Sequence, residues 1–310
     1  MDVVFCGTPQ FAVPALSALV ESGFSVRLVV SQPDRPAGRG LTIVPTPVKQ
    51  CAMEHGIPVI QPEKIKANEE FRSQLLAIRP AAIIVVAYGR IIPQWMIDLP
   101  PLGNINVHAS LLPKYRGAAP IQWAIAMGET VTGVTTMRID AGLDTGDMLL
   151  KREVPILPED TAETLAPKLS EAGGSLLVET LRKLEAGIVT PIQQDHSQAT
   201  LAPILKKEDG RIDWNRTATE IWNRLRGFTP WPGAFTTYRG KNLNIWKAHP
   251  AASGTEPLAP GQMHAQGDHL YVGCGQSTVL EIIELQPEGK KRMSARDFVN
   301  GYKPENSMIG

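Results

Sequence analysis

The sequence has few cysteines and no long apolar run. Cysteine occurs only at Cys6, Cys51 and Cys274, which excludes a disulfide scaffold and a cysteine-rich zinc site and indicates reduced thiols. No apolar run approaches the roughly 20 residues of a membrane-spanning helix. The opening MDVVFCGTP also lacks the charged segment and cleavage site of a secretory signal. These absences predict a cytoplasmic protein without membrane contact, and the lack of a transit peptide favours a bacterial one.

The chain also lacks net charge, since 31 Lys and Arg residues balance 31 Asp and Glu residues. The charges are unevenly divided. Residues 1–205 hold 17 basic and 20 acidic residues, a net −3, and residues 206–310 hold 14 and 11, a net +3. This modest asymmetry leaves two alternatives for the second half, an ordinary mixed surface or attraction of a polyanion. The length and the 43% hydrophobic content are typical of a globular protein with about two domains.

The first half alternates short β-rich runs with helical patterns. The runs DVVFCG, FSVRLVVS, AAIIVVAYG, GNINVHAS and VTGVTTMRID are apolar on both faces, which is typical of strands covered by helices on either side. Helices are expected in FAVPALSALVESG and over roughly 161–187, with Gly173 and Gly174 as a weak point in the second. The pattern predicts an α/β domain with a mostly parallel sheet, ending near residue 188.

The pattern changes after residue 188. The polar, proline-containing stretch at 189–207 is typical of a linker. One helical stretch, TATEIWNRLRGF, then precedes the short alternating runs GAFTTYRG, LNIWKAH, HLYVGCG and TVLEIIELQ. Short strands separated by turns predict a small β-barrel or sandwich at 208–310.

The turn after the first strand contains a single glycine, Gly7. The G-x-G-x-x-G fingerprint is therefore absent, which disfavours a dinucleotide oxidoreductase. The following helix could bind an anion at its N-terminus or simply complete a tight turn.

The loop SQPDRPAGRGLTIVPTPVK, residues 31–49, is rich in proline and carries Arg35, Arg39 and Lys49. We expect it to form neither a helix nor a central strand. Arginine suits phosphate, but an ordinary surface loop is an equal alternative.

A polar pair, Asn106 and His108, ends the apolar run NINVH. Side chains two apart share a face of a strand, so the pair points one way while Ile105 and Val107 point into the packing. The carboxyl ends of parallel strands are where open α/β sheets bind ligands. An amide beside an imidazole there suits a developing oxyanion, although an isolated histidine is more often structural.

A carboxylate partner for His108 is expected in the loop IDAGLDTGDML. Its glycines allow Asp140, Asp144 or Asp147 to approach the imidazole and orient it. Asx turns are the alternative for two of these residues, and calcium binding is disfavoured because the EF-hand pattern is missing. No G-x-S-x-G elbow accompanies the cluster, so direct transfer between two bound substrates is the chemistry that these residues favour.

Several stretches together resemble the methionyl-tRNA formyltransferases over nearly the whole chain. In order, they are FCGTPQFAVPAL, QPDRPAGRG, VVAYGRIIP, NVHASLLPKYRGAAPIQWA, DAGLDTGDM, KEDGRIDW and RLRGFTPWPGAF. The Asn-x-His, Ser-Leu-Leu-Pro and later Asp elements resemble the wider class of formyltetrahydrofolate-dependent transferases. DRPAGRG, RGAAPIQ and GFTPWPGAF are more specific to the tRNA enzymes.

The resemblance implies a Rossmann-like catalytic domain at 1–188, a linker at 189–207 and an OB-like, tRNA-binding β-barrel at 208–310. The donor would be 10-formyltetrahydrofolate, with no metal, and the acceptor the α-amino group of initiator methionyl-tRNA, in translation initiation. The catalytic residues would be Asn106, His108 and Asp144. The first two would donate hydrogen bonds to the oxyanion, and Asp144 would orient His108 and help to remove the amine proton.

The resemblance also implies substrate contacts. Folate contacts are expected at Tyr88, Gly89, Arg90, Ile91, Ser110, Leu111, Leu112, Pro113, Asp140 and Gly142. Contacts with tRNA are expected at Arg35, Arg39, Lys49, Lys206, Lys207, Arg211, Lys290, Lys291 and Arg292, any of which could instead be a solvated surface charge. The chain departs from the family where Leu41 and Thr42 replace lysines after GRG, so Arg39 would carry more of the phosphate contact.

Two other functions are alternatives. A nucleotide-sugar N-formyltransferase would keep the chemistry and change the acceptor, and a non-catalytic RNA-binding protein would keep only the fold. The intact Asn106, His108 and Asp144 disfavour the second alternative, and the length excludes a single-domain purine transformylase. A monomer is expected.

Overall fold

The computed structural model describes residues 1–37, 42–304 and 307–310, which pack into two compact units. Unit 1 comprises Met1–Pro120, Val131–Pro155 and Ala166–Ala202, and unit 2 comprises Ile121–Thr130, Ile156–Leu165 and Pro203–Gly310. No helix in the described ranges is long and apolar enough to cross a membrane.

This division differs from the boundaries expected from the sequence. Segments 121–130 and 156–165, expected in the first domain, pack with unit 2. Residues 189–202, expected in the linker, pack with unit 1 because their backbone pairs with it: Ile192 bridges Met148, and Leu201 bridges Arg116. We call residues 189–202 the strap.

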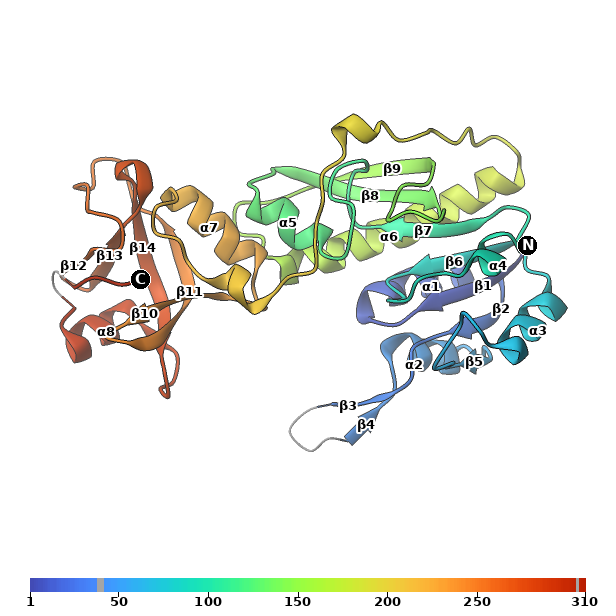
Figure 1. The fold of residues 1–310 in the computed structure, drawn as a ribbon, viewed down its shortest axis with the longest axis horizontal. Helices are drawn as coiled ribbons and strands as arrows, with labels where there is room; N and C mark the ends of the chain where they lie inside the picture. Colours follow the sequence, from blue (N-terminus) through green and yellow to red (C-terminus); the bar gives the residue numbers. More distant parts are fainter. Residues whose placement is uncertain (38–41, 305–306) are drawn as a thin grey trace. The chain divides into compact units, whose positions relative to one another are not determined.

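Unit 1 is built on a mostly parallel sheet, which confirms the predicted α/β fold. Within the described residues it has seven strands in the order β5-β2-β1-β6-β7-β8-β9 (Figure 1). Strand β8 runs opposite to both of its neighbours, β7 and β9, and all other neighbouring strands are parallel. The strands are β1 (Asp2–Gly7), β2 (Ser25–Val30), β5 (Val59–Ile60), β6 (Ala82–Val86), β7 (Asn104–His108), β8 (Val131–Arg138) and β9 (Met148–Pro155).

Helices cover both faces of this sheet, as the apolar strands predict. The helices of the chain up to the strap are α1 (Val13–Glu21), α2 (Pro47–Glu54), α3 (Glu69–Ile78), α4 (Gln94–Ile97), α5 (Pro120–Ala126) and α6 (Ala162–Glu185). On β1, Phe5 packs with α1, α2 and α6, whereas Val4 packs with α3 and α4. Ile105 and Val107 of β7 face the α1 and α6 layer, so Asn106 and His108 lie on the opposite face.

Helix α6 runs without a break through Gly173 and Gly174, where a weak point was expected. A Cβ at Gly173 would lie 2.9 Å from Cγ1 of Val107, and one at Gly174 would lie 2.9 Å from the carbonyl oxygen of Pro14. The glycines therefore let the helix pack closely on the sheet and on α1, which offsets their low helix propensity.

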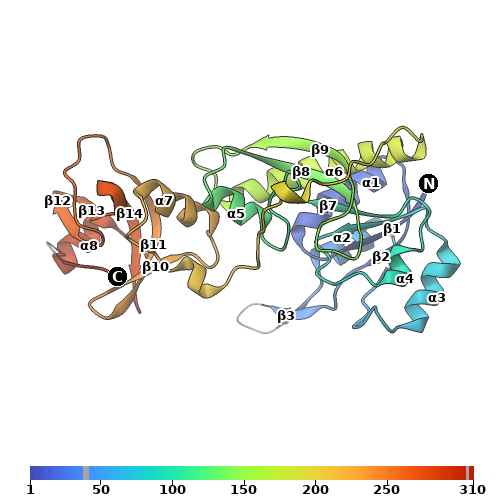
Figure 2. The same cartoon turned by 45° about the horizontal axis from the view of Figure 1, so that its top comes forward.

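The described residues of the proline-rich segment 31–49 contain no strand of the central sheet, as expected, but they do form a short separate ribbon. Its strands β3 (Arg35–Ala37) and β4 (Thr42–Val44) pair with each other and not with the central sheet, and both views show them projecting from unit 1 (Figure 1, Figure 2). The expected absence of helix is wrong at the end of the segment. Helix α2 begins at Pro47. Proline is favourable at this first position because the backbone N–H that it lacks would have no partner within the helix, and the side chain of Thr46 caps the helix.

All three cysteines are buried. Burial raises the pKa of the Cys6 thiol, and it raises that of Cys274 to about 12.

Unit 2 contains an antiparallel sheet in the order β10-β11-β14-β13-β12, with β15 paired to β14. Its elements are α7 (Ala218–Gly227), β10 (Ala234–Tyr238), β11 (Lys241–Pro250), β12 (Met263–Gln266), β13 (His269–Gly273), β14 (Val279–Pro287), β15 (Met293–Ser294) and α8 (Ala295–Tyr302). Helix α7 forms within the helical stretch expected from the sequence, and it begins with a capping box between Thr217 and Glu220.

The C-terminal residues 307–310 close this sheet into a small barrel, one of the two forms expected from the sequence. Ile309 bridges Tyr238 of β10, and its N–H donates to the carbonyl of Gly261 at 2.9 Å. The N–H of Met263, at the start of β12, donates to Ser307 at 2.8 Å. The tail thereby supplies hydrogen-bond partners for backbone groups at the free edges of the two outermost strands, β10 and β12. Ile309 is buried with the barrel core.

We predict that Ile309→Ala lowers the free energy of unfolding of unit 2 by roughly 2–5 kcal/mol, because it empties a core position at the closure. The neighbouring Met308 is 60% exposed, so Met308→Ala should change the free energy by less than about 0.5 kcal/mol. Calorimetry of both variants checks this, and equal effects would mean that the tail does not close the barrel.

Candidate functional site

Three polar side chains of β7 share one face, and they do different things. Asn104 donates to the carbonyls of Met96 and Ile97 in α4, at 2.9 and 3.0 Å, and is buried there. Asn106 is half-buried, and its amide makes no hydrogen bond to any described residue. Asn104 therefore holds α4 on the sheet, whereas the amide of Asn106 is free to bind a ligand.

His108, at the carboxyl end of β7, is buried between two polar neighbours. Its Nε2 lies 2.9 Å from the carbonyl oxygen of Tyr115, and its Nδ1 lies 3.7 Å from Oδ2 of Asp144. Since a carbonyl oxygen only accepts, Nε2 donates its hydrogen to Tyr115. In the neutral ring the lone pair of Nδ1 therefore faces the carboxylate, and attraction between them requires a proton on Nδ1.

Of the three aspartates considered, the structure brings Asp144 to His108. Strand β8 runs antiparallel to β7, and its end at Arg138 pairs with Ile105, so the loop 139–147 must fold back to reach His108. Oδ2 of Asp144 also accepts from the N–H of Gly117 at 2.9 Å. Its backbone has φ 51°, a left-handed conformation that residues other than glycine rarely adopt.

Asp140 serves its own loop, as the Asx-turn alternative predicts. Its carboxylate accepts from the N–H of Gly142 at 3.0 Å and from the hydroxyl of Thr145 at 2.7 Å. In the same loop Leu143 is 64% exposed.

The Ser-Leu-Leu-Pro turn is rigid, and two of its side chains are buried. Ser110 donates to the carbonyl of Lys114 at 2.6 Å, and Leu112 is 1% exposed. Thr135 links the turn to β8, since its hydroxyl donates to the carbonyl of Ser110 at 2.7 Å and accepts from the N–H of Leu112 at 3.2 Å. Ser110 and Leu112 are therefore covered by the protein, whereas Leu111 and Pro113 are half-buried.

The loop after β6 places predicted folate residues beside the end of β7. Tyr88 is buried, which raises the pKa of its hydroxyl. Gln32 donates to the carbonyls of Tyr88 and Gly89 at 2.9 and 3.2 Å. Nε of Arg90 is buried with no hydrogen-bond partner among the described residues, and Ile91 is 93% exposed.

The predicted tRNA contacts differ in their surroundings. Lys49 is held by Asp34 at 2.5 Å and by Gln61 at 2.7 Å, and its hydrogen bond is the main cause of the lowered pKa of Asp34. Arg292 pairs with Glu284 and lies over the ring of Trp246 at 5.1 Å. The other predicted tRNA contacts that the structure describes are exposed and make no ion pair with a described residue. They are Arg35, Lys206, Lys207, Arg211, Lys290 and Lys291. Arg39 and Leu41 lie outside the described residues.

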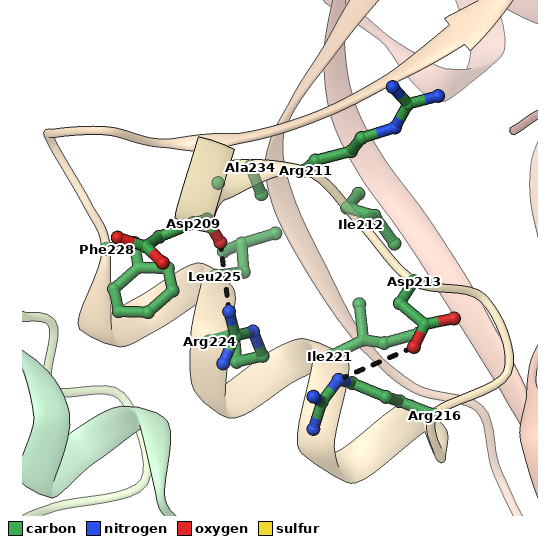
Figure 3. Close-up of a pocket in the computed structure, with 11 residues that line it drawn as sticks. Asp209, Arg211, Ile212, Asp213, Arg216, Ile221, Arg224, Leu225, Phe228 and Ala234 are labelled. Atoms are coloured by element: carbon green, nitrogen blue, oxygen red, sulfur yellow. Dashed lines mark hydrogen bonds and ion pairs between the residues drawn. The ribbon is translucent and has the colours of Figure 1, made fainter. Parts of the chain in front are cut away.

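A small hollow in unit 2 lies between α7 and the 3-10 turn Lys207–Gly210 (Figure 3). Its polar groups bind one another. Arg224 donates to the carbonyl of Asp209 at 3.0 Å, and Nε of Arg216 lies 3.8 Å from Oδ2 of Asp213. Figure 3 shows the guanidinium of Arg211 pointing away from the hollow, so we place no chemistry there.

Sequence reasoning missed three contributors to the site at β7. Two are backbone groups, the carbonyl of Tyr115 and the N–H of Gly117, which the side-chain pattern does not indicate. The third is Gln194 of the strap, whose amide donates to the carbonyls of Asp144 and Gly146 at 2.9 and 2.8 Å. The sequence around Gln194 is polar and has neither helical nor strand periodicity, so it indicated only a linker.

Comparison with known proteins identifies the family. The formyl transferase family model matches residues 1–181, and the model of the formyl transferase C-terminal domain matches residues 204–303. The methionyl-tRNA formyltransferase of Koribacter versatilis is 66% identical over 99% of this chain and 97% of its own length. That of Acidobacterium capsulatum is 62% identical over 97% of this chain and 96% of its own length.

A solved structure shares the fold. The sugar 3N-formyl transferase WlaRD, solved in the presence of dTDP and 5-N-formyl-THF, superimposes with a TM-score of 0.68 at 18% identity, covering 94% of this chain and 99% of its own. At such low identity the similarity shows only that the fold is shared. The family is shown by the relatives of high identity and by the two family models. The chain belongs to the formyl transferase family, and within it to the methionyl-tRNA formyltransferases.

Proposed function

We propose that this protein transfers the formyl group of 10-formyltetrahydrofolate to the α-amino group of initiator methionyl-tRNA, for translation initiation. The observation that carries the proposal is the convergence of Asn106, His108 and Asp144 at the carboxyl end of β7, in a member of this family. The bound donor supplies a formyl carbon attached to a folate nitrogen. The residues of the chain position the amine, stabilise charge and move protons.

Asn106 is the proposed donor to the formyl oxygen. Negative charge develops on that oxygen as the amine adds to the carbon, and a fixed amide donor beside it lowers the energy of the transition state. The free amide of Asn106 meets this need without first breaking another hydrogen bond.

His108 and Asp144 are the proposed proton acceptors. The neutral ring has its hydrogen on Nε2, so the lone pair of Nδ1 and the carboxylate, 3.7 Å apart, can both receive the proton that the amine must lose. Once protonated, Nδ1 is attracted to Asp144 and can donate to the oxyanion or return the proton to the folate nitrogen as the carbon–nitrogen bond breaks. The donor role expected for His108 thus belongs to the protonated ring.

The residues of the site fit a folate. Ile91 and Leu143 expose apolar side chains that a flat heterocycle would cover, and the buried Nε of Arg90 has a hydrogen to donate. We propose that the exposed Gly89 contacts the folate through its backbone, and that the buried Tyr88, Ser110 and Leu112 hold the walls of the folate site in place. The other proposed contacts are Leu111, Pro113, Asp140 and Gly142.

We propose that exposed cations bind the tRNA phosphates. Arg35 on the ribbon is free to do so, as are Lys206, Lys207 and Arg211 before α7 and Lys290 and Lys291 after β14. Lys49 and Arg292 must first exchange an existing carboxylate partner, so their contribution should be smaller.

We further propose that the protein acts in the cytoplasm as a monomer. Light scattering should then give a mass near 33.7 kDa. Twice that mass would contradict the monomer.

The proposed function is tested with purified protein and 10-formyltetrahydrofolate against three acceptors: charged initiator tRNA, charged elongator methionine tRNA and an amino-sugar nucleotide. We expect formylation of the initiator tRNA. Transfer to the sugar alone would keep the chemistry and overturn the acceptor, and no transfer to any of them would support an RNA-binding protein without catalysis.

We predict that Asn106→Ala and His108→Ala each lower kcat by a factor of roughly 100 to 1,000 or more, with folding unchanged, because each removes a group that acts in the transition state. Asp147→Ala in the same loop is the control and should stay within a few-fold of the wild type. Steady-state kinetics with circular dichroism checks this, and nearly normal turnover of the first two variants would contradict their assignment.

The KM for tRNA should rise steeply with salt, with a slope of about 0.7–0.9 in log–log form per phosphate contact. Replacing Lys290 and Lys291 by Gln should lower this slope by the amount expected for the loss of about one to two phosphate contacts. The matched control is the double replacement of the exposed Lys64 and Lys66, which have no proposed contact. A KM that hardly changes with salt would be inconsistent with binding through phosphates.

A further inference from the structure

The strap crosses the site and contacts its most constrained residue. Gln194 is 3% exposed, and its Nε2 donates to two carbonyls of the loop 139–147, that of Asp144 at 2.9 Å and that of Gly146 at 2.8 Å. The two carbonyls flank Thr145, so a single amide group holds both ends of the segment that carries the carboxylate.

The amide of Gln194 is itself held in one orientation. Its Oε1 accepts from Nε and Nη2 of Arg116, at 3.0 and 2.7 Å. A guanidinium only donates, so the oxygen must face Arg116 and the NH₂ group must face the loop. Every strong hydrogen-bonding position of the amide is then occupied, and the group cannot turn over without breaking four hydrogen bonds.

Arg116 is fixed by the same strap. Its N–H donates to the carbonyl of Thr200 at 2.9 Å, and its carbonyl accepts from Ala202 at 2.7 Å. Its Nη1 lies 3.1 Å from Nδ1 of His196. The next residue, Gly117, gives its N–H to the carboxylate of Asp144, so Arg116 and Gln194 together secure the backbone and the side chain of Asp144.

Asp144 needs this support because its backbone is left-handed, at φ 51°. Aspartate adopts this region more readily than most non-glycine residues, but still at a cost, so hydrogen bonds from neighbouring residues help to keep it there. Without the two bonds from Gln194, the loop can relax to a right-handed or extended conformation, which would swing the carboxylate away from His108.

We propose that Gln194 is a positioning residue for formyl transfer, which keeps Asp144 in its left-handed conformation and its carboxylate against His108 and Gly117. The inference rests on the proposed function of Asp144. It gives the strap, expected only to link two domains, a part in the reaction.

The decisive variant is Gln194→Glu. The carboxylate has nearly the shape of the amide and pairs well with Arg116, so the strap stays in place. It has no hydrogen to donate, and it faces the carbonyls of Asp144 and Gly146 with negative charge. The matched control is Gln193→Glu, the same substitution at the adjacent, exposed position.

We expect Gln194→Glu to lower kcat by roughly 10- to 100-fold while KM for tRNA changes by less than about threefold, since a displacement of about 1 Å is enough for such a loss. In an Asp144→Ala background the same substitution should leave kcat within about twofold, because no carboxylate is left to position. A kcat near that of the wild type, or an equal loss in both backgrounds, would overturn the proposal.

Amide hydrogen exchange at Gly117 provides a readout independent of activity. Its N–H is protected by the Asp144 carboxylate, so exchange should accelerate in Gln194→Glu and not in Gln193→Glu. Unchanged exchange would refute the positioning role. A wild-type protein that transfers no formyl group would refute the proposed function instead, while the exchange result would still decide whether Gln194 places Asp144.

Discussion

The site depends on a loop that must fold back along its own sheet. Because β8 runs antiparallel to β7, the chain leaves β8 beside the beginning of β7, a full strand length from His108. The loop 139–147 recovers that distance by turning sharply. A Cβ at Gly146 would lie 1.9 Å from the carbonyl oxygen of Arg138, so only glycine fits there. The left-handed backbone of Asp144 and its supporting hydrogen bonds are consequences of this return path.

The parts of the fold that the sequence predicts are those with local periodicity. The apolar strands, the long helix and the face shared by Asn106 and His108 follow from side-chain spacing alone, and the structure has them. The spacing could not assign the partner of His108 among three aspartates, since that depends on the path of a glycine-rich loop. Helix α8 was missed although it is amphipathic and Ser294 caps it, because its eight residues are fewer than the roughly 11 to 18 over which helical periodicity is normally recognised.

Contacts between residues far apart in the chain explain the remaining differences. Gln194 lies 50 residues from Asp144, and nothing in its neighbourhood in the sequence distinguishes it from a linker residue. Lys49 looks like a free cation in the sequence, yet Asp34, 15 residues before it, accepts its hydrogen bond. In both cases a polar side chain expected to meet solvent or a ligand is used inside the protein, where unpaired polar groups are costly.

The burial of the cysteines has a practical consequence. A thiol reacts as its thiolate, and burial both covers these three groups and, for Cys6 and Cys274, disfavours the charged form. In the folded chain the native thiols should therefore react only slowly with thiol reagents. One cysteine introduced at an exposed strap position such as Gln198 would be the single reactive thiol, and a fluorophore attached there would report on the strap while substrates bind.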